Sequence, residues 1–236
     1  MDISLSYTEA GDKTGDGIPL IFLHGNGEDS SYFAGQLKYF KNSYHIYAID
    51  TRGHGNSPRG TKPFTLVQFA EDLLCFMDEH GIQKAHLLGF SDGANIAILF
   101  ALMHQERAAK LILNGGNIFP HGMKFTVWLG VVLGYRFAVH SAKKREDAKK
   151  KADAKKKAEL FSLMANEPQL TAEDLKKITV PTLVIAGTHD MIKKKHTRLI
   201  AENIRGAKLV FIPGSHFTAA ENPDAFNEAV EVFLKE

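Results

Sequence analysis

Hydrophobic residues along the chain fall into short unbroken runs that alternate with longer segments of helical spacing. The runs have the length and composition of buried strands and cover residues 19–23, 45–49, 85–90, 108–113, 181–186 and 208–212. Between them, hydrophobic positions three and four residues apart predict helices over residues 32–40, 64–80, 94–103, 192–204 and 224–234. Residues 3–7 alternate apolar and polar side chains, which predicts a half-exposed strand, and residues 12–17 predict a turn. This order predicts an α/β fold, in which a mostly parallel central sheet carries helices on both faces.

One long segment breaks the alternation. Residues 125–139 are apolar, and residues 142–157 hold nine Lys or Arg residues against three acidic ones. A run this basic can bind nucleic acid, but its Ala residues favour a helix and no aromatic residue is interleaved for base stacking, so we favour a solvated helix face. We predict a single domain over residues 1–236 with a small helical cap, residues 118–170, inserted within it. The apolar half of this cap is expected to cover the substrate pocket, and the Lys-rich half to face water.

The bulk composition limits the classes of protein to consider. The chain has 236 residues, of which 44% are hydrophobic, so it can build one domain with an ample core, and its net charge of +2 indicates no particular partner. Its single Cys, Cys75, excludes an internal disulfide, and we interpret it as a structural thiol because no basic residue lies beside it. Residues 1–4 lack the basic start of a signal peptide, and the longest apolar stretch, residues 127–135, is too short to span a bilayer. We therefore expect a cytoplasmic protein with no membrane and no nucleic-acid partner, and we leave its oligomeric state open.

The chemically most distinctive segment joins a predicted strand to a predicted helix. Gly89-Phe90-Ser91-Asp92-Gly93 lies between the apolar run of residues 85–90 and a second one, rich in Ala, Ile and Leu, at residues 94–103. A turn this sharp forces its middle residue into a strained backbone conformation, and small residues two positions before and after it prevent a clash. We predict that the Ser91 hydroxyl stands clear of the sheet at the positive end of a helix, where an anion is stabilised.

Three further polar segments directly follow predicted strands. They are the loop containing Asn26, whose flanking glycines allow backbone N–H groups to turn toward a ligand, and the loops that contain Asp190 and His216. Ligands of parallel sheets bind at the carboxyl ends of the strands, so we expect all three segments to meet Ser91 at one edge. A serine is a weak nucleophile unless an imidazole takes its proton and a carboxylate orients that imidazole. We therefore predict Ser91 as nucleophile, His216 as general base and Asp190 as the residue that orients it.

Neighbouring polar residues have simpler interpretations. We interpret Asp50 and Arg52 as a structural ion pair and His24 as an anchor of its own loop. His189 is the other candidate base, but a base adjacent to its own orienting Asp190 could not easily face the nucleophile. No group of His and carboxylate residues has metal-ligand spacing, and no predicted strand is followed by G-x-G-x-x-G, so we predict neither a metal nor a cofactor.

Over essentially its full length the chain resembles the α/β-hydrolase fold superfamily. The resemblance is carried by His24-Gly25-Asn26-Gly27, Asp50-x-Arg52-Gly53-x-Gly55-x-Ser57, Gly89-Phe90-Ser91-Asp92-Gly93, the strand leading to Asp190, and Gly214-Ser215-His216. The chain order Ser, Asp, His is that of the fold. The resemblance implies that the backbone N–H groups of Asn26 and Asp92 form an oxyanion hole. Members of the family often have a Pro soon after the catalytic acid, and residues 191–194 contain none.

The side chain of Asp92 allows two interpretations. A carboxylate in the first turn complements the helix dipole and accepts local hydrogen bonds, which is the simpler one. The alternative is recognition of a substrate amine, because a carboxylate beside an apolar pocket is costly without a cation. Gly-x-Ser-Asp-Gly also resembles the elbow of biphenyl-hydrolase-like members, which include hydrolases of amino-acid esters.

These observations predict a serine hydrolase that cleaves a small carboxylic ester or related acyl compound through an acyl-enzyme intermediate. A dehalogenase or epoxide hydrolase of this fold would have Asp in place of Ser91, which argues against both. A lactonase or a carbon–carbon bond hydrolase uses the same three residues and stays an alternative. From a different class, the alternative is a protein of this fold that binds a small ligand without turnover.

Overall fold

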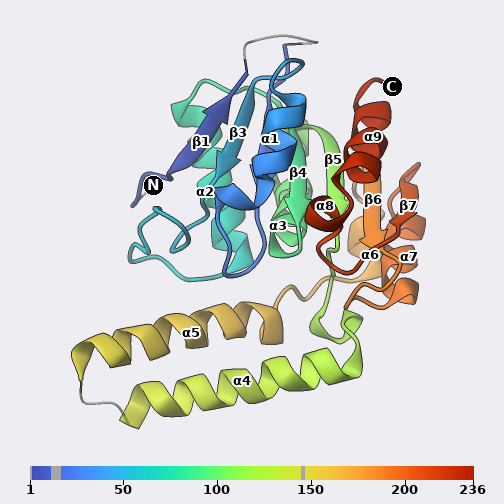
Figure 1. Ribbon diagram of the computed structural model, residues 1–236. Coiled ribbons are helices and arrows are strands. Elements are labelled where there is room, and N and C mark those ends of the chain that lie inside the picture. Colours follow the sequence, from blue (N-terminus) through green and yellow to red (C-terminus); the bar gives the residue numbers. More distant parts are fainter. Residues whose placement is uncertain (1, 12–16, 145–146) are drawn as a thin grey trace.

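The computed structural model describes residues 2–11, 17–144 and 147–236, and its centre is a seven-stranded sheet (Figure 1). The strand order is β1-β3-β2-β4-β5-β6-β7. β1 pairs antiparallel with β3, and every other pair is parallel. The strands are β1 (Tyr7–Ala10), β2 (Leu20–Leu23), β3 (Ile46–Ile49), β4 (Ala85–Phe90), β5 (Ala108–Asn114), β6 (Thr182–Gly187) and β7 (Lys208–Ile212). The predicted α/β fold class is confirmed.

The first strand lies later in the chain than predicted. The alternation of residues 3–7 predicts a strand there, but β1 covers Tyr7–Ala10. The Ser6 carbonyl still accepts the Asp50 N–H at 2.9 Å, but the Ser6 N–H donates to Ser57 Oγ at 2.7 Å, so regular pairing with β3 begins only at Tyr7. Residues 12–16 of the predicted turn lie outside the described part of the chain.

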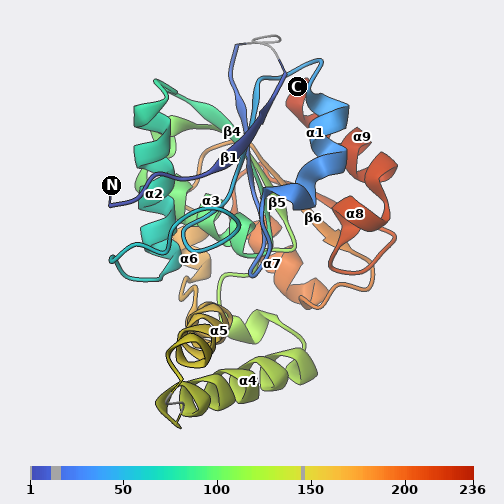
Figure 2. The same cartoon turned by 60° about the vertical axis from the view of Figure 1, so that its left-hand side comes forward.

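Helices cover both faces of the sheet (Figure 2). α2, α3, α6 and α7 contribute to the core on one face, and α1, α8 and α9 to the core on the other. Their bounds are α1 (Ala34–Phe40), α2 (Leu66–Glu79), α3 (Asp92–Met103), α6 (Ala172–Leu175), α7 (Lys194–Asn203), α8 (Thr218–Glu221) and α9 (Pro223–Leu234), with short 3-10 helices at Ser30–Phe33, Gln105–Arg107 and Pro120–Gly122.

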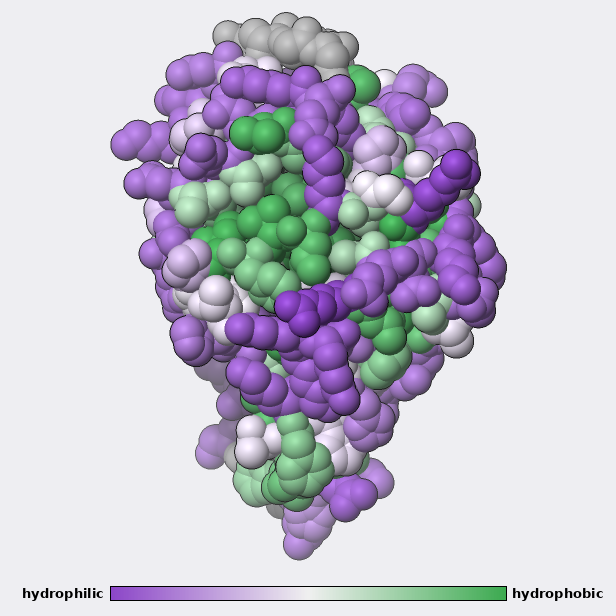
Figure 3. All heavy atoms as spheres, turned by 90° about the vertical axis from the view of Figure 1, so that its right-hand side faces the viewer, coloured by the Kyte–Doolittle hydropathy of each residue, from purple (hydrophilic) through white to green (hydrophobic). Residues whose placement is uncertain are grey.

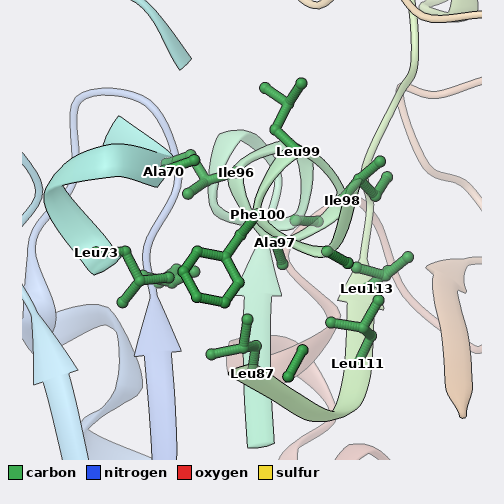
Figure 4. Close-up of a cluster of buried hydrophobic side chains, with 14 of the residues drawn as sticks. Ala70, Leu73, Leu87, Ile96, Ala97, Ile98, Leu99, Phe100, Leu111 and Leu113 are labelled. Atoms are coloured by element: carbon green, nitrogen blue, oxygen red, sulfur yellow. The ribbon is translucent and has the colours of Figure 1, made fainter. Parts of the chain in front are cut away.

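α3 is the most deeply buried of these helices, and it starts directly after Ser91. It is apolar on all sides, as expected for a helix enclosed by its neighbours. Phe100 is fully buried and lies among Leu73 of α2, Leu87 of β4 and Leu111 of β5 (Figure 4). Burying each such side chain stabilises the fold by about 1.5–3 kcal/mol. Ser91 is therefore attached to one of the most firmly packed parts of the molecule.

Two long helices stand apart from the layered body. α4 (Phe125–Lys144) and α5 (Ala148–Asn166) form a hairpin that projects from one end of the molecule, with α5 nearer the body and α4 farther away (Figures 1 and 2). The Leu170 N–H donates to the Ile118 carbonyl at 2.8 Å, so the chain leaves the body and returns to it at adjacent points. This contact supports residues 118–170 as the cap boundaries, which stay a prediction.

The Lys-rich part of the hairpin is largely exposed, but the apolar part is not wholly directed at the body. Phe125, Leu129, Leu133 and Phe137 of α4 are exposed to solvent. The expectation that the apolar half covers the substrate pocket therefore does not account for these four side chains. Hydropathy along the chain shows that a helix has an apolar side without showing which neighbour that side meets. No helix among the described residues combines the length and hydrophobicity needed to cross a membrane.

Candidate active site

Ser91 lies on a sharp turn between β4 and α3 and has φ 53° and ψ −116°. Among the described residues it is the one non-glycine with positive φ. A Cβ on Gly89 would collide with the Gly93 carbonyl, and one on Gly93 would collide with the Leu23 carbonyl of β2. The turn thus requires both glycines, as predicted from the spacing. The strand order reverses beside β2 and β4, the place where open α/β sheets bind ligands.

The structure brings together the three residues predicted to carry the chemistry. His216 Nε2 lies 3.0 Å from Ser91 Oγ, and His216 Nδ1 lies 2.7 Å from Asp190 Oδ1. Asp190 and His216 are buried, whereas Ser91 is partly exposed. When the Nδ1–H donates to Asp190, the lone pair on Nε2 faces the serine hydroxyl. This arrangement can take a proton from Ser91.

Backbone groups hold the Asp190 carboxylate without the proline that often follows in the family. Oδ1 accepts the Ile192 N–H at 2.8 Å, and Oδ2 accepts the Gly187 N–H at 3.4 Å. Ile192 also pairs with Met123, where the chain enters the α4–α5 hairpin. The acid loop is therefore fixed by hydrogen bonds to its own backbone and to the cap entrance.

The imidazole of His216 is positioned by residues that sequence reasoning did not single out. Gly115, the residue after β5, has φ +64°, and a Cβ there would lie 2.7 Å from His216 Cε1 and 2.9 Å from its Nδ1. The His216 ring also lies 4.9 Å from the Phe90 ring, which stacks on Tyr32 at 4.4 Å. A glycine directly after a buried strand was the available signal for Gly115, but nothing in the sequence links it to a histidine a hundred residues later.

Asn26 and Asp92 lie next to each other, and their side chains are joined. Asn26 Nδ2 donates to Asp92 Oδ2 at 2.9 Å and to the Leu160 carbonyl of α5 at 3.0 Å. Asn95 Nδ2 lies 3.4 Å from Asp92 Oδ1. Among the described residues, no acceptor receives the backbone N–H of Asn26 or of Asp92. Both N–H groups are thus free to bind an oxyanion, and that role stays a prediction.

Two carboxyl groups near the nucleophile, those of Asp92 and Glu28, lie in an environment that disfavours their charge. Burial raises the pKa of Asp92, although the hydrogen bonds from Asn26 and Asn95 oppose this shift. Burial likewise raises the pKa of Glu28, whose carboxylate accepts the Gly25 N–H at 3.3 Å. No described Lys, Arg or His forms an ion pair with Asp92; its partners are amides. The interpretation of Asp92 as a hydrogen-bond acceptor therefore has direct structural support.

The predicted ion pair between Asp50 and Arg52 is wrong. Arg52 is fully buried and binds Asp72 through Nε and Nη2, at 2.6 and 2.7 Å, and Asp2 at 2.6 Å. Asp50 instead accepts the backbone N–H groups of Ser30 and Asn56, at 2.8 and 2.9 Å. The side chains of Asp50 and Arg52 do not pair, because each binds other partners.

His24 and His189, the two other histidines considered in the sequence analysis, lie where it placed them. His24 is buried, with Nδ1 2.7 Å from the Gly25 carbonyl and Nε2 3.0 Å from the Thr51 N–H, so it anchors its own loop. His189 is exposed and lies 3.0 Å from Thr188 Oγ1. The residue beside Ser91 is His216. Among the described residues, no group of three or more His, Cys, Asp or Glu side chains is arranged to hold a metal ion.

Fold and site together define an α/β hydrolase, and comparison with known proteins agrees. The family model described as alpha/beta hydrolase fold matches residues 18–137. The protein belongs to this family, which confirms the resemblance found in the sequence.

Its relatives include hydrolases with different substrates. The chain is 27% identical to 3-oxoadipate enol-lactonase 2 of Acinetobacter baylyi, with 99% of this chain and 94% of the relative covered. It is also 27% identical to 2-hydroxymuconate semialdehyde hydrolase of Pseudomonas putida, covering 94% of this chain and 89% of the relative. A solved structure of the enol-lactonase from Burkholderia xenovorans superposes with a TM-score of 0.81 at 26% identity, covering 99% of this chain and 97% of that one.

Proposed function

We propose that the protein is a serine hydrolase that cleaves a small carboxylic ester or a related acyl compound through an acyl-enzyme intermediate. The observation that carries this proposal is the continuous line from Ser91 Oγ through His216 to Asp190, with distances of 3.0 and 2.7 Å. Both distances lie within the range required for a nucleophile, its base and the group that orients the base.

In the proposed mechanism, Ser91 Oγ attacks the carbonyl carbon while its proton passes to His216 Nε2. The carbonyl oxygen becomes an oxyanion, which the backbone N–H groups of Asn26 and Asp92 stabilise, each by roughly 3–4 kcal/mol in the transition state. Collapse of this intermediate breaks the bond to the leaving alcohol, which takes the proton from His216. Water then repeats the sequence on the acyl-enzyme, and Asp190 stabilises the imidazolium in both halves.

A lactone is the second candidate substrate. A lactone is a cyclic ester, so its opening needs the same nucleophile, base and oxyanion donors. The observation that favours it is the similarity to enol-lactonases from two organisms. Activity against linear esters and lactones of equal acyl length therefore distinguishes the two candidates without altering the proposed roles of the residues.

The proposal is tested by covalent labelling followed by kinetics. A fluorophosphonate should add once to the wild-type protein by intact mass, and the adduct should be absent in Ser91→Ala. Ser91→Ala and His216→Ala should each lower kcat on a p-nitrophenyl ester by several orders of magnitude, and the double variant should lose little more, because the residues act as a unit.

The matched control is His189→Ala, which removes the adjacent histidine and should leave turnover near the wild-type value. An unlabelled wild type would favour a ligand-binding protein without turnover. If His189→Ala lost turnover while His216→Ala stayed near the wild-type value, the general base would be His189 and the proposed assignment would be wrong.

A further inference from the structure

Helix α4 exposes four large hydrophobic side chains to solvent along its length. Phe125, Leu129, Leu133 and Phe137 are exposed by 64, 39, 56 and 74%. They recur at every fourth position, so they form one stripe along the helix. α4 is the outer helix of the hairpin, and Figure 3 shows a hydrophobic patch on the narrow lower part of the molecule, with hydrophilic atoms below it and apart from the larger hydrophobic area over the body. We call these four residues the α4 stripe.

The same helix carries positive charge and no negative charge. α4, all of whose residues are described, contains no Asp or Glu. Arg136, Lys143 and Lys144 are exposed in its second half, as is Lys124 just before its first turn. A helix with Phe and Leu along an exposed stripe and basic residues beside it has the pattern of a helix that lies in a membrane interface.

A cavity at the far end of the hairpin brings further lysines to the stripe. It has a volume of about 430 Å³ and lies between α4 and α5. Phe137 of the α4 stripe lines it together with Phe161, and Lys150 and Lys157 of α5 stand at its wall, with one acidic residue, Asp153. Hydrophobic surface and cationic groups are thus contiguous across the two helices.

We propose that the α4 stripe, with Lys150 and Lys157 at its border, docks on an anionic lipid bilayer. The stripe would enter the boundary between headgroups and acyl chains, and the basic residues would meet lipid phosphates, each contribution adding to the affinity. α4 would lie along the surface rather than cross it. The sequence-based expectation of no membrane partner rests on the lack of a spanning segment, which does not bear on this kind of contact.

The charge pattern favours a bilayer over a second copy of the chain. Two copies pairing through their stripes would bring Arg136, Lys143 and Lys144 against a helix that offers no carboxylate. An anionic bilayer supplies both an apolar medium and the negative charge that α4 lacks. Aliphatic side chains such as Leu129 and Leu133 also have no use in base stacking, which disfavours a nucleic acid.

The fluorescence of Trp128 can report vesicle binding directly. Trp128 is the single Trp of the chain and lies on α4, with its ring 5.9 Å from that of Phe125. Vesicles of phosphatidylcholine and phosphatidylglycerol should shift the Trp128 emission to shorter wavelength. The protein should also sediment together with these vesicles. Brominated acyl chains should quench the emission. Vesicles of phosphatidylcholine alone should bind less, and added salt should weaken binding to the anionic vesicles.

Two double variants separate the contributions. Leu133→Ser with Phe137→Ser should weaken vesicle binding by roughly tenfold or more, since it removes apolar surface that enters the bilayer. Lys150→Gln with Lys157→Gln should also weaken it and reduce its salt dependence. Val232→Ser, on the exposed side of α9 where Val232 is 58% exposed, is the matched control and should bind as wild type. All these residues lie outside the proposed catalytic site, so turnover of a soluble ester should be unchanged.

The proposal is overturned if wild type does not bind anionic vesicles, or if the Leu133/Phe137 double variant binds them equally well. It is also overturned if light scattering shows a wild-type dimer that the same double variant converts to a monomer, which would assign the stripe to a second copy. A salt-sensitive DNA complex without vesicle binding would assign the surface to nucleic acid instead.

Discussion

At Ser91 the backbone adopts a conformation that costs of order 1–3 kcal/mol for a residue with a side chain. The cost is tolerated because Gly89 and Gly93 let β4, α3 and β2 approach each other closely. The buried apolar face of α3 then holds the turn in place. Strain at this residue therefore results from packing elsewhere, and it leaves the hydroxyl within 3.0 Å of His216.

The side chain of Asp92 can be assigned by a substrate comparison. Because amides of Asn26 and Asn95 engage its carboxylate, we expect no preference for an amino-acid ester over its des-amino analogue. The ratio of the two kcat/KM values should be near one and unchanged in Asp92→Asn. A wild-type preference for the amine that Asp92→Asn removes would instead show that the carboxylate binds a substrate ammonium.

At the scale of elements, the site depends on loops from separate strands meeting at one sheet edge. Gly115, at the end of β5, stands against His216, which follows β7. A side chain at position 115 cannot be accommodated without moving the imidazole. The distance between Ser91 and His216 is thus controlled by a residue that takes no part in the proposed chemistry.

We predict that Gly115→Ala lowers kcat by roughly 100-fold, because its Cβ would lie 2.7 Å from the His216 ring and displace it. The matched control is Gly81→Ala at the end of α2. Gly81 has nearly the same φ, +66° against +64°, but a Cβ there meets nothing within 4 Å. Both variants should lose about 1–2 kcal/mol of unfolding free energy from the positive φ. If Gly81→Ala lost as much activity as Gly115→Ala, strain rather than displacement of His216 would be the cause.

At the scale of the whole molecule, buried histidines make stability depend on pH. Burial lowers the pKa of His54 to about 4, and burial also lowers that of His196 to about 4, from the usual 6.5. Between these values the unfolded chain binds protons that the folded protein does not. The stability that this difference contributes is complete above pH 6.5 and is lost as pH falls toward 4.

We therefore expect the unfolding free energy, measured with urea, to fall steeply between pH 6.5 and about 4. His196→Asn should flatten this dependence, because it removes one group that must stay neutral in the folded state. His140→Asn, at an exposed position on α4, should leave the slope as in wild type. If the unfolding free energies of wild type and His196→Asn changed with pH in parallel, His196 would not be a source of the pH dependence.

Much of this architecture follows from patterns that are local in the sequence. Unbroken apolar runs predict the inner strands, and the spacing of Gly89 and Gly93 predicts the turn at Ser91. The placement of Asp190 and His216 follows from the rule that parallel strands end at one edge. These inferences succeed because each depends on neighbouring residues and on one general property of parallel sheets.

The parts that could not be predicted depend on contacts between distant segments. Arg52 turns away from Asp50 to Asp72 and Asp2, and no local pattern signals that choice. The bond from Asn26 to Leu160 joins residues far apart in the chain. The orientation of α4 is likewise set by α5 and the body, so its hydropathy alone could not show that the stripe is exposed to solvent.

The hydrogen bond between Leu170 and Ile118 has a consequence for how this protein can diversify. A segment whose ends already meet can be lengthened, shortened or exchanged at little cost in chain closure, which grows only slowly with length. The sheet would need no adjustment, provided that the pairing of Met123 with Ile192 at the entrance of the hairpin, which helps to fix the Asp190 loop, is kept. Substrate preference and the surface to which the protein binds can thus change through substitutions in the hairpin, while the residues proposed for the chemistry stay the same.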